Sequence, residues 1–232
     1  MSREAPLAPY EALLAEFPSS PTAELRRFAD ARPADADAAV SLYRGYLAWR
    51  AGDGAPAALA ARSAAVDDRS FASLGGFAGP RGGDRVFLVE GARYDVNTDA
   101  AAYVALLCEE MDAVLDAASD ARLVVLVDCR PHEGWRNPPG YAFLPLIRAI
   151  AAVVPNTYPE RLRAVVVYPL PRWASVLLGT VTALLDAKTR DKIVLLPGET
   201  DLGSPCPEGL RDHVALDALP AHARGRGYDA LS

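Results

Sequence analysis

The sequence contains few of the residues that build disulfide frameworks, metal sites and basic surfaces. Its 232 residues include three cysteines and three histidines, and no CxxC pair occurs. Three widely spaced cysteines do not make a disulfide framework or a zinc site, and they favour reduced thiols in a cytosolic protein. The 24 lysines and arginines are outnumbered by 30 acidic residues. The basic face of a nucleic-acid-binding protein is therefore not expected.

Long apolar runs are also missing. The N-terminal stretch MSREAPLAPYEALL lacks the apolar core of a signal peptide. No run reaches the roughly 18 apolar residues that a membrane-spanning helix needs. A polybasic membrane anchor is absent as well. We therefore expect a cytoplasmic protein, and any contact with a membrane must be made mainly through apolar surface.

The first part of the chain has the pattern of helices. Apolar residues recur at helical spacing in the segments 10–17, 22–28 and 35–50. Breaks rich in glycine and proline follow at 51–56 and 75–84. We therefore divide the chain into a helical N-terminal segment, a connecting loop and a main domain, which cover residues 1–66, 67–84 and 85–232.

The main domain alternates between two kinds of pattern. Short apolar runs predict strands at 86–90, 122–128, 164–168 and 192–196. Helices are predicted between them at 98–118, 141–154 and 171–186. The runs at 122–128 and 164–168 are continuously apolar, which is typical of strands buried on both faces. The alternation predicts an α/β fold with a mainly parallel sheet.

One predicted helix is unusual because residues 173–185 carry no charge. A surface helix of a globular protein normally places charges on its outer face. Three interpretations remain open: a buried core helix, a helix that touches a membrane, and a lid over an apolar cavity. One helical face would consist of Trp173, Val176, Leu177, Thr180, Val181, Leu184 and Leu185.

Signatures of catalysis are sparse. The sequence has no GxxxxGK[ST] phosphate loop and no GxSxG nucleophile elbow. Asp128 and His132 follow a predicted strand, at the edge where open α/β sheets bind ligands, and they are the best catalytic pair available. We expect no metal and no cofactor.

A cluster of basic residues lies in the second half of the sequence, and its pattern is typical of a solvated surface. Its members are Arg161, Arg163, Lys188, Arg190 and Lys192.

Several motifs resemble one known family. Residues 158–162 read YPERL, a predicted strand and the charge-free helix follow, and residues 185–193 read LDAKTRDKI. This order resembles the YPERL, strand, gate helix and FLDPKTRDKI pattern of the Sec14-like CRAL-TRIO lipid-binding family, of the phosphatidylinositol transfer type. LRRFADAR at 25–32 and YLAWR at 46–50 resemble the family's helical N-terminal segment. The resemblance implies a mainly parallel sheet floor and helices that enclose an apolar lipid cavity, with 171–186 as its gate.

The resemblance also implies a site for a lipid head group. Family members that carry phosphatidylinositol hold it with polar residues that correspond here to Glu160, Thr189, Lys192 and Arg32. Lys192 and Arg32 would oppose the phosphate charge. Glu160 and Thr189 would hydrogen-bond inositol hydroxyls or orient the lysine. The implied protein is a monomeric, non-enzymatic carrier that contacts membranes transiently.

The chain departs from the family pattern at some positions. Members that also carry phosphatidylcholine have polar residues where Leu123 and Val125 stand, so phosphatidylcholine is not expected here. Exchange of phosphatidylinositol for some other second lipid stays open. Leu184 replaces the phenylalanine that is usual in the gate. Three alternatives to a phosphatidylinositol carrier remain open. They are a carrier of a sterol, tocopherol or retinoid-like molecule, a lipid-independent interaction module, and an enzyme that uses Asp128 and His132.

Overall fold

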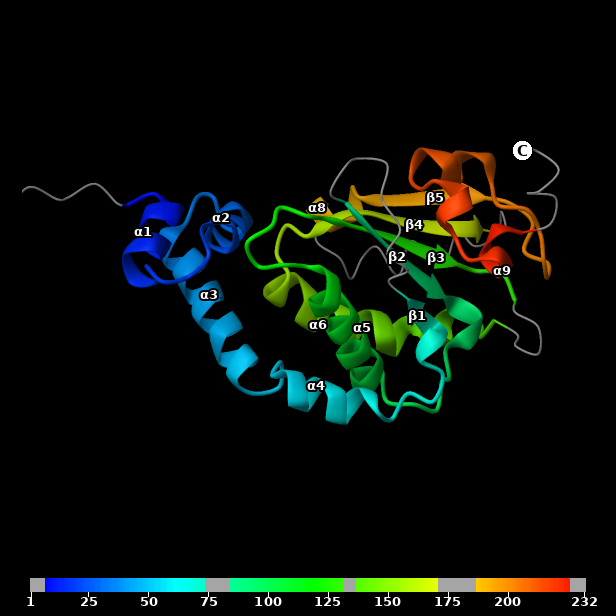
Figure 1. Cartoon of the computed structure of the whole chain (residues 1–232), viewed down its shortest axis with the longest axis horizontal. Helices are drawn as coiled ribbons and strands as arrows, with labels where there is room; N and C mark the ends of the chain where they lie inside the picture. Colours follow the sequence, from blue (N-terminus) through cyan, green and yellow to red (C-terminus); the bar gives the residue numbers. More distant parts are fainter. Residues whose placement is uncertain (1–6, 74–83, 132–136, 171–186, 226–232) are drawn as a thin grey trace, which may run out of the picture.

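A computed structural model of the chain describes residues 7–73, 84–131, 137–170 and 187–225 (Figure 1). A helical N-terminal segment lies on one side of a larger body that contains a sheet. Within the described ranges, no helix has both the length and the apolar character needed to cross a membrane.

The N-terminal segment forms helices where apolar residues recur at helical spacing. Their bounds are α1 (Pro9–Glu16), α2 (Thr22–Ala31), α3 (Ala36–Ala51) and α4 (Pro56–Ser63). The side chain of Asp35 caps α3 by accepting the N–H of Ala38 at 2.9 Å. The first three helices enclose a small core whose largest members are Leu13, Leu25, Phe28 and Tyr43, each at most 1% exposed.

The turn between α3 and α4 depends on a glycine. A Cβ atom at Gly54 would lie 2.3 Å from a ring carbon of Trp49, so only glycine allows the chain to pass this indole. Beyond the turn, α4 packs against α5 (Ala100–Val114). The turn therefore joins the N-terminal segment to the helical layer of the main body.

Within the described residues the sheet has five strands, in the order β1-β2-β3-β4-β5. Short β1 pairs antiparallel with β2, whereas β2 to β5 are parallel. Their bounds are β1 (Ala72–Ser73), β2 (Arg85–Glu90), β3 (Leu123–Asp128), β4 (Leu162–Leu170) and β5 (Ile193–Pro197). The predicted α/β fold with a mainly parallel sheet is confirmed.

Different elements cover the two faces of the sheet (Figure 1). On one face lie α5 and α6 (Leu144–Thr157), and on the other lies the C-terminal part of the chain. That part consists of short elements: η5 (Glu208–Asp212), η6 (Leu216–Ala218) and α9 (Ala221–Arg224). Other short elements are η1 (Arg69–Phe71), η2 (Gly91–Arg93), η3 (Gly140–Phe143) and α8 (Ala187–Arg190).

The helix predicted at 98–118 ends earlier, at Val114. The chain then turns, and the side chain of Arg161 donates hydrogen bonds to the carbonyl groups of Asp116, Ser119 and Ala121. These contacts lie beyond the last residue of α5 and hold the loop between α5 and β3. A buried arginine from a distant part of the sequence therefore shapes this loop.

Candidate functional site

Three of the predicted head-group residues lie at one edge of the sheet. Glu160 precedes β4, and Thr189 and Lys192 precede β5, so all three lie near the amino ends of neighbouring parallel strands. The Lys192 N–H donates to the Thr189 carbonyl at 3.1 Å, and the Lys192 carbonyl accepts the N–H of Val165 at 2.9 Å. These bonds tie the turn that carries Thr189 and Lys192 to strand β4.

The turn that carries Glu160 has a strained backbone. Glu160 has a φ angle of 58°, and it is the only residue other than glycine with positive φ in the described part of the chain. The turn closes with a hydrogen bond from the Arg161 N–H to the Tyr158 carbonyl at 3.3 Å. A non-glycine residue in this conformation costs about 1–3 kcal/mol and must be held by its surroundings.

Arg32 lies elsewhere, at the C-terminal end of α2. Its side chain is exposed, and its guanidinium donates to the adjacent Ala31 carbonyl at 2.8 Å. The head-group role of Arg32 stays a prediction.

A different arginine of α2 reaches the amino ends of the parallel strands, which we call the amino edge of the sheet. Arg27 is 8% exposed and donates to the carbonyl groups of Ser119 and Ala117 at 2.7 and 2.8 Å. This residue was not identified from the sequence. Its one sequence signal is the spacing from Glu24, because residues three apart share a helix face, and both side chains are buried.

Arg161 also differs from the expectation that the basic cluster is solvated. Its side chain is 4% exposed, and burial followed by the nearby charge of Arg27 lowers its pKa to about 10. Arg163 makes an ion pair with the buried Asp84, at 2.5 Å. The solvated-surface prediction is therefore wrong for Arg161, whose charge is used inside the fold. Arg163 stays partly exposed beside its buried partner.

A second, half-buried network holds the other end of the Glu160 turn. Arg50 makes a two-pronged ion pair with Asp112, at 2.6 and 2.7 Å, and the Tyr158 hydroxyl donates to the same carboxylate at 2.7 Å. Although burial alone would lower the pKa of Arg50, the hydrogen bonds to Asp112 raise it. Arg50 thus stays charged and ties α3 to α5 and to the turn.

The sheet presents an apolar surface on its helical side. Side chains in register across the strands form two rows, Phe87–Val125–Val165–Ile193 and Val89–Val127–Val167–Leu195. Phe87 is buried, but the other members are only partly buried, and Leu195 is 40% exposed. We call the valine, isoleucine and leucine members of these two rows the aliphatic rows.

The opposite face of β3 and β4 is sealed. Leu126 and Val166 are 0% exposed, and the C-terminal elements cover them. In α6, Ile147, Ile150 and Val153 are likewise only partly buried. A tightly packed core would bury such side chains completely. The aliphatic rows and α6 therefore provide apolar surface in excess of what the described residues cover.

The predicted gate helix at 171–186 lies outside the described residues. Its predicted apolar face, Trp173, Val176, Leu177, Thr180, Val181, Leu184 and Leu185, falls there as well. The role of the gate therefore stays a prediction.

The carboxylate of the predicted catalytic pair has a structural partner. Asp128 is 6% exposed and accepts hydrogen bonds from Nε and an amino group of Arg130. Arg130 also donates to the carbonyl groups of Ser204 and Ala223, at 2.7 and 2.5 Å. The pair thereby fastens the C-terminal elements to the sheet. His132 lies outside the described residues.

In the part of the chain that the structure describes, no three His, Cys, Asp or Glu side chains gather as metal ligands. The three cysteines are unpaired. Burial raises the pKa of Cys108 and of Cys129 to about 12, so both thiols are protonated at neutral pH.

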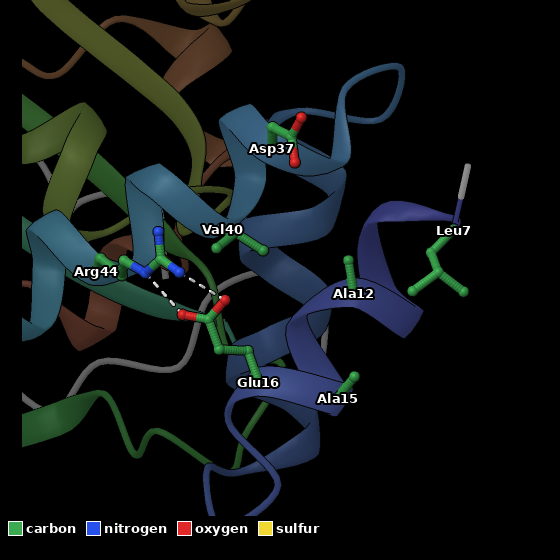
Figure 2. A pocket seen from close by; sticks show the side chains of 7 residues that line it. All are labelled: Leu7, Ala12, Ala15, Glu16, Asp37, Val40 and Arg44. Atoms are coloured by element: carbon green, nitrogen blue, oxygen red, sulfur yellow. Dashed lines mark hydrogen bonds and ion pairs between the residues drawn. The ribbon is translucent and has the colours of Figure 1, made fainter. Parts of the chain in front are cut away.

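A separate hollow of about 540 Å³ lies on the N-terminal segment (Figure 2). Its lining consists of Leu7, Ala12, Ala15, Glu16, Asp37, Val40 and Arg44. Arg44 and Glu16 face each other across it and form a two-pronged ion pair at 2.6 and 2.8 Å. All seven residues belong to α1, α3 or the residues before α1, so this hollow is distinct from the amino edge of the sheet.

Comparison with known proteins agrees with this architecture. The family model described as the CRAL/TRIO domain matches residues 82–225. The crystal structure of Sfh5 is similar in fold, with a TM-score of 0.59 and 15% sequence identity over 78% of this chain. The match spans 66% of the Sfh5 chain, which is less than two thirds of its length. No curated protein matches the sequence. Since the family model covers more than half of its residues, the chain belongs to the CRAL/TRIO domain family.

Proposed function

We propose that this protein binds a membrane phospholipid, with phosphatidylinositol as the favoured cargo, and carries it between membranes. The observation that supports the proposal most is the pair of aliphatic rows. They place partly covered valine, isoleucine and leucine side chains across three or more strands, on the face that α6 overlies. Such a surface fits acyl chains, which require apolar walls.

Energetics explain why a carrier is needed. A diacyl lipid has roughly 30 chain CH₂ groups, and each costs about 0.8 kcal/mol to expose to water. Spontaneous escape from a bilayer therefore meets a barrier on the order of 20 kcal/mol. A protein wall of similar polarity removes most of this cost, so that transfer is nearly neutral. The head-group contacts then decide which lipid is retained.

The amino edge of the sheet supplies candidate contacts of this kind. In this proposal Lys192 opposes the lipid phosphate, while Glu160 and Thr189 hydrogen-bond inositol hydroxyls. One charge-assisted hydrogen bond is worth roughly 1.5–3 kcal/mol, which changes a preference more than tenfold. Arg32 would add a second cation from the end of α2. We further propose that the protein acts as a cytoplasmic monomer that touches membranes transiently and is not an enzyme.

A vesicle transfer assay with matched variants tests the head-group site. Lys192→Ala and Glu160→Ala should lower phosphatidylinositol transfer about tenfold while the circular dichroism spectrum stays unchanged. Arg190→Ala removes a cation from an exposed position of the same α8 region and should leave transfer unchanged. If all three variants transfer phosphatidylinositol as fast as the unaltered protein, the proposed roles of Lys192 and Glu160 are excluded.

A further inference from the structure

The Glu160 turn is connected at both of its ends to the same helix of the N-terminal segment. The first connection starts at Glu24 of α2, which is 7% exposed. Its carboxylate accepts the hydroxyl of Tyr46 at 3.1 Å, and that hydroxyl accepts Nε of Arg50 at 3.3 Å. Arg50 pairs with Asp112, which accepts the hydroxyl of Tyr158 at 2.7 Å. Tyr158 is the first residue of the turn.

Aromatic rings reinforce this first connection. The guanidinium carbon of Arg50 lies 5.3, 4.8 and 5.4 Å from the ring centroids of Tyr46, Trp49 and Tyr158. Cation–π contacts of this kind gain strength when the cation is removed from water. Arg50 is therefore fixed by charge, hydrogen bonds and ring faces together.

The second connection starts one helical turn further along α2. Arg27 donates to the Ser119 carbonyl at 2.7 Å, and Arg161 donates to the same oxygen at 2.8 Å. Arg161 is the last residue of the turn. Glu24 and Arg27 are three residues apart on α2, and they lead to Tyr158 and Arg161, which are also three residues apart.

We propose that α2 fixes the conformation of the 158–161 turn from both ends, which makes Glu24 and Arg27 positioning residues for Glu160. Two fixed ends explain how a residue other than glycine is held at a φ of 58°. The N-terminal segment then frames the head-group site as well as adding to the fold. This consequence for lipid choice rests on the proposed function, whereas the conformational claim does not.

Hydrogen exchange measured by mass spectrometry on the full chain tests the conformational claim. Tyr46→Phe removes the hydroxyl of the first connection and keeps its ring, and Arg27→Lys removes the two-pronged contact of the second. Each should make amides of peptides spanning 157–162 exchange about fivefold faster, the effect of losing one hydrogen bond on a local opening equilibrium. The control is Arg44→Ala, which breaks the exposed ion pair with Glu16 in the same segment but touches neither connection.

Unchanged exchange in the turn, or the same acceleration in Arg44→Ala, would overturn the proposal. A second measurement separates positioning from general stability. Tyr46→Phe should lower the preference for phosphatidylinositol over phosphatidylcholine several-fold at unchanged total lipid load, and it should have no further effect in a Glu160→Ala background. A similar loss in both backgrounds would contradict a role through Glu160. If the unaltered protein takes up no lipid while turn exchange responds as expected, the proposed function fails and the conformational claim stands.

Discussion

Val167 and Leu195 lie side by side on the parallel strands β4 and β5, and both remain partly exposed although their strands belong to the middle and edge of a covered sheet. Val166, the neighbour of Val167 on the opposite face, is 0% exposed. One face of the same strand is therefore packed as a core, and the other retains apolar surface.

This asymmetry predicts that Val167→Trp fills lipid space without damaging the fold. The variant should take up much less fluorescent phospholipid from vesicles, and its unfolding free energy should stay close to that of the unaltered protein. The matched control Val166→Trp should destabilise the fold by about 1–3 kcal/mol, because it overpacks a filled core. If Val167→Trp destabilises as strongly as Val166→Trp, the helical side of β4 is packed as well and the proposed cavity is wrong.

The backbone of Glu160 predicts a separation of stability from function. Glu160→Gly should raise the unfolding free energy by about 1 kcal/mol, since glycine adopts positive φ without a Cβ penalty. The same change removes the carboxylate and should lower phosphatidylinositol retention. Chemical denaturation and lipid competition measure the two effects. A protein that loses stability and keeps its lipid preference would show that the carboxylate serves the fold.

The buried pair of Asp128 and Arg130 predicts a large stability effect. Arg130→Met should lower the unfolding free energy by about 3–5 kcal/mol, because it leaves the Asp128 carboxylate buried without its partner. The double variant Asp128→Asn with Arg130→Met should recover part of this loss, since the isolated charge is gone. Urea denaturation of both variants provides the comparison, and equal stability of the single and double variants would contradict the assigned role.

Buried thiols predict a specific dependence on pH. Burial raises the pKa of Cys108 to about 12, from a reference value of 9.0. Because the folded state holds this proton more tightly, its contribution to stability is complete below pH 9 and is lost as the pH rises towards 12. Cys108→Ala should therefore show a shallower fall of unfolding free energy between pH 9 and 12. Parallel curves for both proteins would mean that this thiol titrates alike when folded and unfolded.

Much of the fold could be predicted because local patterns and tertiary structure agree. The strands at 122–128 and 164–168 are continuous apolar runs, and the structure places both inside the parallel sheet. Helix α3 was indicated by apolar spacing over 35–50, which begins within one residue of its observed start. The head-group residues Glu160, Thr189 and Lys192 were identified through motifs and not through any physical pattern of their own.

The rest could not be predicted because it depends on contacts between distant residues. Apart from its spacing from Glu24, nothing local distinguishes Arg27 from the adjacent exposed Arg26, and nothing local marks Arg161 as buried. The loop after α5 is held by the contacts of Arg161 with three carbonyl groups, and no sequence period encodes that pairing. The C-terminal 3₁₀ elements were also missed, because three- to five-residue turns carry no measurable periodicity.

Lipid extraction tests the central claim most directly. The purified chain would be extracted with organic solvent after native mass spectrometry, and phospholipids would be quantified per chain, with Val167→Trp as the control. The account predicts about one phospholipid per protein, enriched in phosphatidylinositol, and little in the variant. A chain that carries no lipid, and takes none from phosphatidylinositol-containing vesicles, would contradict it.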